Sequence, residues 1–418
     1  MNRNRLGHLL TTIGPGLMLA ATGVGAGDLA GGAFAGMKLG VAVLWAVVLG
    51  AAFKFVITEG LTRWQLATGT TLLEGAVERL GRPVQWGFLL YLLVWSFGVG
   101  SSLISACGVA THALVPVFQD PVVGKVVFGV IHSLAGLLLV WFGTYRFLER
   151  LLGAMVGTMV VIVVVTGFMI GGDFGEVIKG LLVPRVPSVP GGTAWTLALM
   201  GGVGGTLTVL CYGYWIRENG RTRAEDLVAC RWDLGLSYAV MALFGIAMVM
   251  IADGMELSGK GATLVVDLAD RLGERVGTGG RWLFLGGAWA AVFSSLVGVW
   301  QAIPYLFADF WGLITRRKED GESVAIDTRG SVYRGYLLVL SIVPLLGLTY
   351  DFQLVQKLNS VFGALVMPLL AITLLLLNGR KAWVGKEHNN RVLATGALIL
   401  VLAFFAWVGI PKIWAVFR

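Results

Sequence analysis

The chain has 418 residues, of which 56% are hydrophobic and only 13% are charged. Soluble globular domains carry roughly 25% charged residues, so this composition excludes an ordinary soluble protein and places most of the chain in lipid. The net charge of +8 does not indicate nucleic-acid binding, because the basic residues fall in short connections between apolar segments. We therefore expect an all-α integral membrane protein with no nucleic-acid partner.

Eleven segments are apolar enough to cross a membrane as helices, since about 20 residues span a hydrocarbon core of about 30 Å. They cover residues 14–37, 40–66, 84–111, 121–143, 150–171, 193–218, 231–253, 281–311, 333–349, 354–378 and 391–409. We expect all of them to form one transmembrane domain.

The first segment is interrupted by the run Gly23-Val24-Gly25-Ala26-Gly27, and Asp28 follows directly. Glycine lets the backbone leave the helix, and irregular backbone at membrane depth occurs where it is buried or lines a polar cavity. A carboxylate in the membrane costs several kcal/mol unless it is paired or hydrated, so Asp28 is a candidate cation ligand. Alternatively, Asp28 caps the second half of the broken helix, and both roles can coexist.

The second segment carries Lys54 about 14 residues from its outer end, at nearly the depth of Asp28. Three interpretations stay open: Lys54 pairs with Asp28, it occupies the place of a cation in the site, or it snorkels toward the cytoplasmic interface. Glu59 and Arg63 lie four residues apart with the acid first, which predicts an ion pair. We interpret this pair as structural or as part of an inner gate.

The sixth segment contains a second glycine run, Gly201-Gly202-Val203-Gly204-Gly205, five helices after the first. Close helix packing is one explanation of such glycines. Matched interruptions in two halves are, however, typical of inverted-repeat transporters that bind substrate at the membrane midplane. We expect one repeat at about 14–171, a second at about 193–378 and an extra helix at about 391–409.

Oxygen-bearing side chains follow the second glycine run and begin the tenth segment. They belong to Thr206 and Thr208 after the break, and to Gln356 and Asn359 in segment 354–378. Such oxygens suit Mg, Ca or Mn, and equally a hydrogen-bonded organic cation. Arg334 lies at a cytoplasmic helix end, where solvated or gate-forming charge is the ordinary interpretation.

Basic residues are distributed asymmetrically between the two ends of the predicted helices. They gather at 79–82, 146–150, 217–231, 316–318 and 380–391, whereas the short connections 37–40 and 349–352 carry almost none. Because positive residues accumulate on the cytoplasmic side, we place these clusters and the N-terminus in the cytoplasm. The predicted location is the plasma (inner) membrane, with multiple passes.

The stretch from Gly14-Pro15-Gly16 through Gly27-Asp28 to residues 66–69 resembles the first two helices of the Nramp family of divalent-metal transporters. Residues 293–310, 333–346 and 359–370 agree further, so the resemblance covers nearly the whole chain in order. It implies a LeuT-like fold of two inverted five-helix repeats with broken helices one and six. It also implies proton-linked uptake of manganese or iron across the plasma membrane.

The sequence departs from the family at the residues that define it. Where the family has Asp-Pro-Gly-Asn, residues 25–28 read Gly-Ala-Gly-Asp, so Gly25 occupies the metal-binding Asp position. The family's Met-Pro-His aligns with residues 208–210, which read Thr-Val-Leu, and the third segment lacks the family's acidic proton-path residues. Gln356 roughly matches a glutamine ligand.

These observations define the predicted site. Its predicted metal ligands are Asp28, Gly25, Gly205, Thr208 and Gln356, and its predicted gating or coupling residues are Lys54, Glu59, Arg63 and Arg334.

Three functions remain open, and the first is an Nramp-like secondary transporter of a divalent cation centred on Asp28. The second is a LeuT-fold transporter of amino acids or amines, with Asp28 binding the ammonium and Tyr212 or Trp215 as a gate. The third is a non-transporting sensor on the same fold. The sequence holds no nucleophile elbow, P-loop or zinc-protease helix, so we expect neither an enzyme nor a cofactor.

Overall fold

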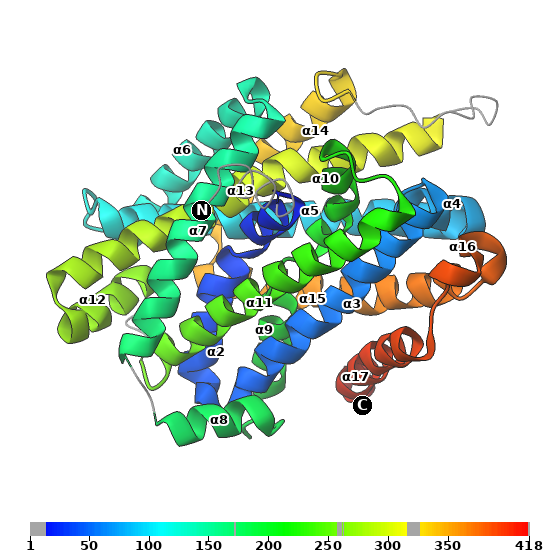
Figure 1. The fold of residues 1–418 in the computed structure, drawn as a ribbon. Coiled ribbons are helices and arrows are strands. Elements are labelled where there is room, and N and C mark those ends of the chain that lie inside the picture. The colour runs from blue at the N-terminus through cyan, green and yellow to red at the C-terminus, as the bar shows by residue number, and fades with distance from the viewer. Residues whose placement is uncertain (1–13, 171–172, 257–260, 262, 316–326, 417–418) are drawn as a thin grey trace, which may run out of the picture.

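The computed structural model describes residues 14–170, 173–256, 261, 263–315 and 327–416. These residues form helices joined by short connections, with no β-strand among them (Figure 1). The predicted all-α fold is therefore confirmed. The basic cluster at 316–318, which we place in the cytoplasm, lies outside the described residues.

Every predicted membrane segment contains helix. In the first half, residues 14–23 are helical. They are followed by η1 (Gly27–Gly31), α2 (Gly32–Leu39), η2 (Gly40–Val43), α3 (Leu44–Thr68), α5 (Arg82–Leu114), α6 (Pro121–Phe142) and α7 (Tyr145–Ile170).

The second half contains the remaining predicted segments. They form α9 (Gly192–Gly202), η3 (Leu207–Cys211), α10 (Tyr212–Glu218), α11 (Leu227–Ala252), α13 (Thr278–Thr315), α14 (Ser331–Ile342), η5 (Val343–Thr349), α15 (Phe352–Asn378) and α17 (Val392–Val416). The short η4 (Ala224–Asp226) lies in the connection before α11.

By length and composition, nine helices of the described chain can cross a membrane. One of them, Gly27–Thr68, joins two predicted segments, because α2 continues through η2 into α3. Gly40 has a φ of +65°, a conformation that glycine adopts without strain, and it allows the turn between them. Val392–Trp407 is a shorter apolar helix. The predicted number of eleven is therefore approximate.

Four short helices lie outside the predicted segments. They are α4 (Leu72–Leu80), α8 (Phe174–Leu182), α12 (Leu264–Val276) and α16 (Lys381–His388). Helix α4 begins with a capping box, in which the Thr71 hydroxyl accepts from the Glu74 amide and the Glu74 carboxylate accepts from the Thr71 amide. A Thr-x-x-Glu sequence is a signal for a helix start, so α4 was predictable.

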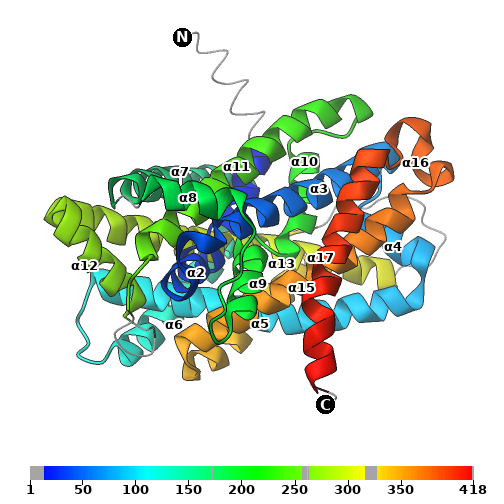
Figure 2. The ribbon, with the colours of Figure 1, turned by 90° about the horizontal axis from the view of Figure 1, so that it is seen from below.

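The broken helices lie inside the bundle. Helix α9 packs against η1, α2, α3 and α15, while α3 and α11 run side by side (Figure 1). Helix α17 lies at the periphery against α15 and α3, as both views show (Figure 2). The middle of both broken helices is therefore enclosed by other helices and removed from lipid.

Candidate functional site

The first helix is interrupted where the glycine run predicts. Residues 14–23 are helical, residues 24–25 form a bend, and the π-helix η1 begins at Gly27. The break requires small residues, because a Cβ atom at Gly25 would lie 2.2 Å from Ser295 Oγ. Asp28 lies in the first turn of η1 and is fully buried.

The second break also lies where it is predicted. Helix α9 ends at Gly202, and residues 203–206 leave the helix before η3 begins at Leu207. Gly204 and Gly205 have φ angles of +76° and +78°. Two consecutive left-handed residues are strained for any side chain, so only glycine suits this turn.

The two breaks contact each other directly. A Cβ at Gly23 would lie 3.0 Å from backbone atoms of Gly204 and Gly205, and one at Gly27 would lie 3.1 Å from Gly202 Cα. A cavity of about 30 Å³ lies beside this contact. One water molecule needs roughly 10–15 Å³ of such space, so the cavity has room for an ion or for water.

Several buried oxygens around the breaks have no hydrogen-bond partner among the described residues. They are Thr208 Oγ1, Asn359 Oδ1, Ser360 Oγ and both carboxylate oxygens of Asp28, although the backbone amides of Gly25 and Gly204 lie near enough to that carboxylate to stabilise its charge. The first three residues line the cavity. Asp28 itself does not line it, but the preceding residue, Gly27, does. Buried polar groups are normally hydrogen-bonded, so a cluster of unpartnered oxygens indicates a binding site.

Lys54 is fully buried on α3, and its ammonium group donates to the carbonyl oxygens of Gly201, Val203 and Gly205. The snorkelling interpretation is therefore wrong. No direct ion pair joins Lys54 to Asp28 among the described residues, although the two charges interact electrostatically. The ammonium instead neutralises the carbonyl end of α9, where a cation is favourable.

Two of the predicted ligands have their polar groups occupied within the chain. The Gly205 carbonyl accepts from Lys54. The Gln356 amide exchanges hydrogen bonds with Ser102, because the Ser102 hydroxyl donates to Oε1 at 2.6 Å and Nε2 donates to the Ser102 carbonyl at 2.9 Å. Asn359, one turn further along α15, carries an unpartnered amide oxygen and lines the cavity.

The predicted pair of Glu59 and Arg63 is confirmed, with 3.3 Å between Arg63 Nε and Glu59 Oε2. Glu59 also accepts from Arg231 of α11 at 2.7 Å, and Arg63 Nη1 donates to the His388 carbonyl beyond α15. The pair therefore cross-links three parts of the chain. Arg334 stacks over the Trp141 ring at 4.6 Å, and its gating role stays a prediction.

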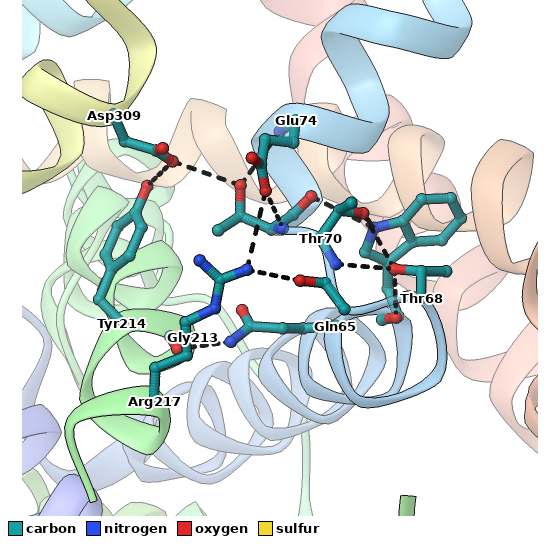
Figure 3. Close-up of polar contacts among 11 residues, drawn as sticks. Gln65, Thr68, Thr70, Glu74, Gly213, Tyr214, Arg217 and Asp309 are labelled. Atoms are coloured by element: carbon teal, nitrogen blue, oxygen red, sulfur yellow. Dashed lines mark hydrogen bonds and ion pairs between the residues drawn. The ribbon is translucent and has the colours of Figure 1, made fainter. Parts of the chain in front are cut away.

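A polar network ties the second half of helix six to its neighbours (Figure 3). The Tyr214 hydroxyl donates to Asp309 Oδ2 of α13 at 2.7 Å, and Thr71 donates to the same oxygen at 3.4 Å. Arg217 donates to the Gly69 carbonyl at 2.7 Å. Helix α10 is thereby fixed to α13 and to the connection between α3 and α4.

A second buried network fixes the start of the first helix. The Asp233 carboxylate accepts from the Gly16 amide at 3.0 Å, from the Tyr212 hydroxyl at 2.9 Å and from Arg221 at 3.2 Å. Both broken helices are thus held at the same end of the bundle. Asp233 was not among the predicted residues, although an acidic residue near the start of apolar segment 231–253 was a visible signal.

No group of three or more His, Cys, Asp or Glu side chains converges on a possible metal position within the described parts of the chain. A metal in the cavity would therefore meet hydroxyl, amide and backbone oxygens, and the Asp28 carboxylate lies one residue beyond the lining residue Gly27. Such all-oxygen ligand sets suit hard cations.

Comparison with known proteins identifies relatives of the whole chain. The family model described as Natural resistance-associated macrophage protein-like (Nramp) matches residues 16–414. A divalent metal cation transporter MntH of Verminephrobacter eiseniae is 26% identical over 316 residues, which cover 72% of this chain and 70% of that protein. The MntH of Mycobacterium tuberculosis is 23% identical over 392 residues, covering 91% and 86%.

Solved structures of similar fold include two kinds of transporter. The manganese transporter of Eremococcus coleocola superimposes with a TM-score of 0.70 at 17% identity, covering 98% of this chain and 87% of that one. MhsT in complex with L-phenylalanine reaches 0.63 at 17% identity, with coverage of 96% and 98%. The fold is therefore LeuT-like, and because the family model spans nearly all of the sequence, this chain belongs to the Nramp family.

Proposed function

We propose that this protein is a secondary transporter that moves a divalent metal cation, with a site centred on Asp28. The observation that carries the proposal is the cluster of unpartnered oxygens on Asp28, Thr208, Asn359 and Ser360 beside the two helix breaks. Relatives along the chain are divalent metal cation transporters, which supports the same substrate class.

The orientation and the repeat organisation are part of this proposal. The N-terminus lies in the cytoplasm, because basic residues gather at the corresponding helix ends. Residues of about 14–171 and 193–378 form two inverted repeats, each contributing one broken helix, and residues of about 391–409 add one helix. The protein lies in the plasma membrane.

Transport of an amino acid or amine is a second candidate, supported by the fold shared with MhsT. The relatives argue against it, because the Nramp family model spans nearly all of the chain and the matched relatives are divalent metal cation transporters. We therefore favour a metal.

Replacing Asp28 with Asn tests the proposal, because the change removes one negative charge and nearly keeps the shape. We expect Asp28→Asn to lower the affinity for Mn²⁺ and Mg²⁺ by at least about tenfold, since a buried carboxylate supplies most of the attraction for a cation. Isothermal calorimetry on the purified protein, with an amino-acid panel beside the metals, measures this.

Asp120→Asn is the matched control, because Asp120 caps α6 at the surface and Asn is an equally good cap. It should bind metal as the unaltered protein does. Thermal unfolding of both variants separates loss of binding from loss of fold. Unchanged metal affinity in a folded Asp28→Asn protein would reduce Asp28 to a structural role, and binding of an amino acid alone would favour the second candidate. If the unaltered protein binds none of the metals or amino acids, the result would favour a non-transporting sensor on the same fold.

A further inference from the structure

An apolar pocket of about 490 Å³ lies on the side of the bundle formed by α4, α5, η3 and α15. Its wall is built almost entirely from hydrocarbon side chains, including Leu72, Leu80, Phe88, Leu210 and Leu376. Tyr91 also lines it. Its hydroxyl donates to the Phe362 carbonyl, so Tyr91 adds no unpaired polar group to the pocket wall. An occupant must therefore be apolar over most of its length. We call this cavity the α4–α15 pocket.

Positive charge gathers at one end of the α4–α15 pocket. Arg79 and Arg82 adjoin the lining residues Leu80 and Pro83, while Arg380 and Lys381 follow α15 just after the lining residue Leu376. All four cations are exposed, and none forms a salt bridge among the described residues. Glu78 is the single acidic residue in the stretches 76–84 and 376–384.

Two of these cations converge on one aromatic ring. The guanidinium carbon of Arg380 lies 4.3 Å from the centroid of the Trp383 ring, and that of Arg79 lies 5.4 Å from the same ring. They come from elements about 300 residues apart, α4 and the start of α16. Stacking on tryptophan orients each guanidinium and leaves its N–H groups free, a geometry that suits a phosphate oxygen.

The inner wall of the pocket reaches the proposed substrate site. Leu207 and Leu210 of η3 line the pocket, and Thr208 between them lines the cavity at the helix breaks. The η3 helix thus separates the two spaces. An occupant of the pocket would support the segment that carries Thr208.

We propose that the α4–α15 pocket binds an anionic phospholipid, with an acyl chain in the apolar pocket and the phosphate between Arg79 and Arg380. Two features together favour a phospholipid as the ligand. The apolar pocket matches an acyl chain, and the exposed basic side chains at its end match an anionic headgroup. The orientation given under the proposed function puts the site in the cytoplasmic leaflet, where anionic lipids attract basic side chains. The lipid site itself does not depend on what the protein transports.

Native mass spectrometry of the purified full chain tests the proposal with phosphatidylglycerol and phosphatidylcholine of identical acyl chains. We expect the protein to bind phosphatidylglycerol about tenfold more tightly, since its headgroup has a net negative charge, whereas the choline of phosphatidylcholine balances its phosphate. The double variant Arg79→Gln with Arg380→Gln should lose this preference. Arg275→Gln with Arg329→Gln removes the same charge at two other exposed positions, and should retain it.

Filling the pocket tests the acyl chain separately. Gly87 lines the pocket, and a Cβ there would meet nothing within 4 Å, so Gly87→Leu adds bulk without displacing the protein. We expect this variant to bind both lipids at least about tenfold more weakly at this site. Gly157→Leu on α7 is the control, because its Cβ also meets nothing within 4 Å and it lies outside the pocket.

Thermal unfolding of each variant confirms that it is folded before lipid binding is compared. Retained phosphatidylglycerol preference in the Arg79 and Arg380 double variant would overturn the headgroup assignment. Displacement of the lipid by glycerol 3-phosphate alone, or unchanged binding in Gly87→Leu, would overturn the acyl-chain assignment. These experiments measure lipid binding and not transport. A negative result would therefore not contradict the proposed metal site, and loss of metal binding would not contradict the lipid site.

Discussion

The Lys54 ammonium contacts three carbonyl oxygens of one unwound segment, an arrangement that a bound metal ion would otherwise adopt. The position of Lys54 along its helix predicts a depth near that of Asp28, but nothing in the sequence identifies these three partners. They lie 147 to 151 residues further along the chain and depend on how α9 ends. The structure thus favours the interpretation in which Lys54 occupies the place of a cation.

Lys54→Met keeps the hydrocarbon stem and removes the charge. We expect the unfolding free energy to fall by about 3 kcal/mol without added cation, because buried carbonyl oxygens lose their donor. We also expect metal affinity to rise at least about tenfold, because a competing positive charge beside Asp28 is gone. Thermal unfolding and calorimetry measure the two effects. Lys386→Met, at an exposed position, should change neither, and a Lys54→Met protein with unaltered stability and affinity would contradict this role.

Gly25 stands where the family resemblance places a metal-binding aspartate, yet the structure has no room for a side chain there. A Cβ would lie 2.2 Å from Ser295 Oγ and 2.4 Å from Ser295 Cβ. Ser295 of α13 therefore occupies the space that an aspartate side chain at position 25 would need. The sequence alone could identify the departure at Gly25 but not this compensation from residue 295.

We expect Gly25→Asp to destabilise the protein by about 1–3 kcal/mol, the usual cost of overpacking a close contact. Adding Ser295→Gly should recover part of that loss, since it removes both atoms that clash with the new side chain. Thermal unfolding of the two single variants and the double variant gives the coupling between the positions. Strictly additive effects would mean that Ser295 does not restrict position 25.

At the scale of the helix, apolar length and glycine runs located the membrane segments and both breaks. The choice between Gln356 and Asn359 lay beyond the sequence, because residues three apart on a helix share a face. The packing of α15 against α5 distinguishes the two side chains. The Gln356 amide is hydrogen-bonded to Ser102 of α5, whereas Asn359 keeps an unpartnered oxygen at the cavity and is available as a ligand. Apolar length does not reveal the short helices α4, α8, α12 and α16, because they do not span the membrane, although the capping box before α4 is a visible signal in the sequence.

The network in Figure 3 fixes α10 through a small number of polar contacts, so we expect it to control how readily this half-helix moves. Tyr214→Phe removes the hydrogen bond to Asp309 and keeps the aromatic packing against Tyr305. We expect Cys211, which is buried beside α10, to react several-fold faster with a maleimide, because a net contribution of about 1 kcal/mol is lost.

Mass spectrometry of the modified peptide measures the rate at Cys211 separately from the other two cysteines. Tyr336→Phe, which removes a hydrogen bond to Ser96 away from α10, is the matched control and should leave the rate unchanged. Equal rates in Tyr214→Phe and the unaltered protein would mean that the remaining contacts suffice to hold the helix.

At the scale of the molecule, the Nramp scaffold is retained while its ligand chemistry is replaced. Transition metals gain over magnesium or calcium mainly through nitrogen and sulfur ligands, whereas oxygen-only sites discriminate by cavity size and ligand number. Thr208 and Leu210 occupy the positions aligned with the family's thioether and imidazole. Within the described residues, the oxygens left unpartnered at the breaks are carboxylate, hydroxyl and amide oxygens.

We expect Mn²⁺ and Mg²⁺ to be transported with apparent affinities within about tenfold of each other, because the unpartnered oxygens at the breaks are hard ligands that give manganese little advantage. We also expect little proton coupling, since residues 101–105 of α5 are serine and aliphatic residues without a carboxylate. Protein reconstituted in liposomes gives both quantities, through metal flux with and without a pH gradient and internal pH recorded in parallel. Asp28→Asn in the same liposomes supplies the background. Tight manganese-selective uptake with matching acidification would contradict both expectations and require ligands and a proton path beyond those that line the breaks.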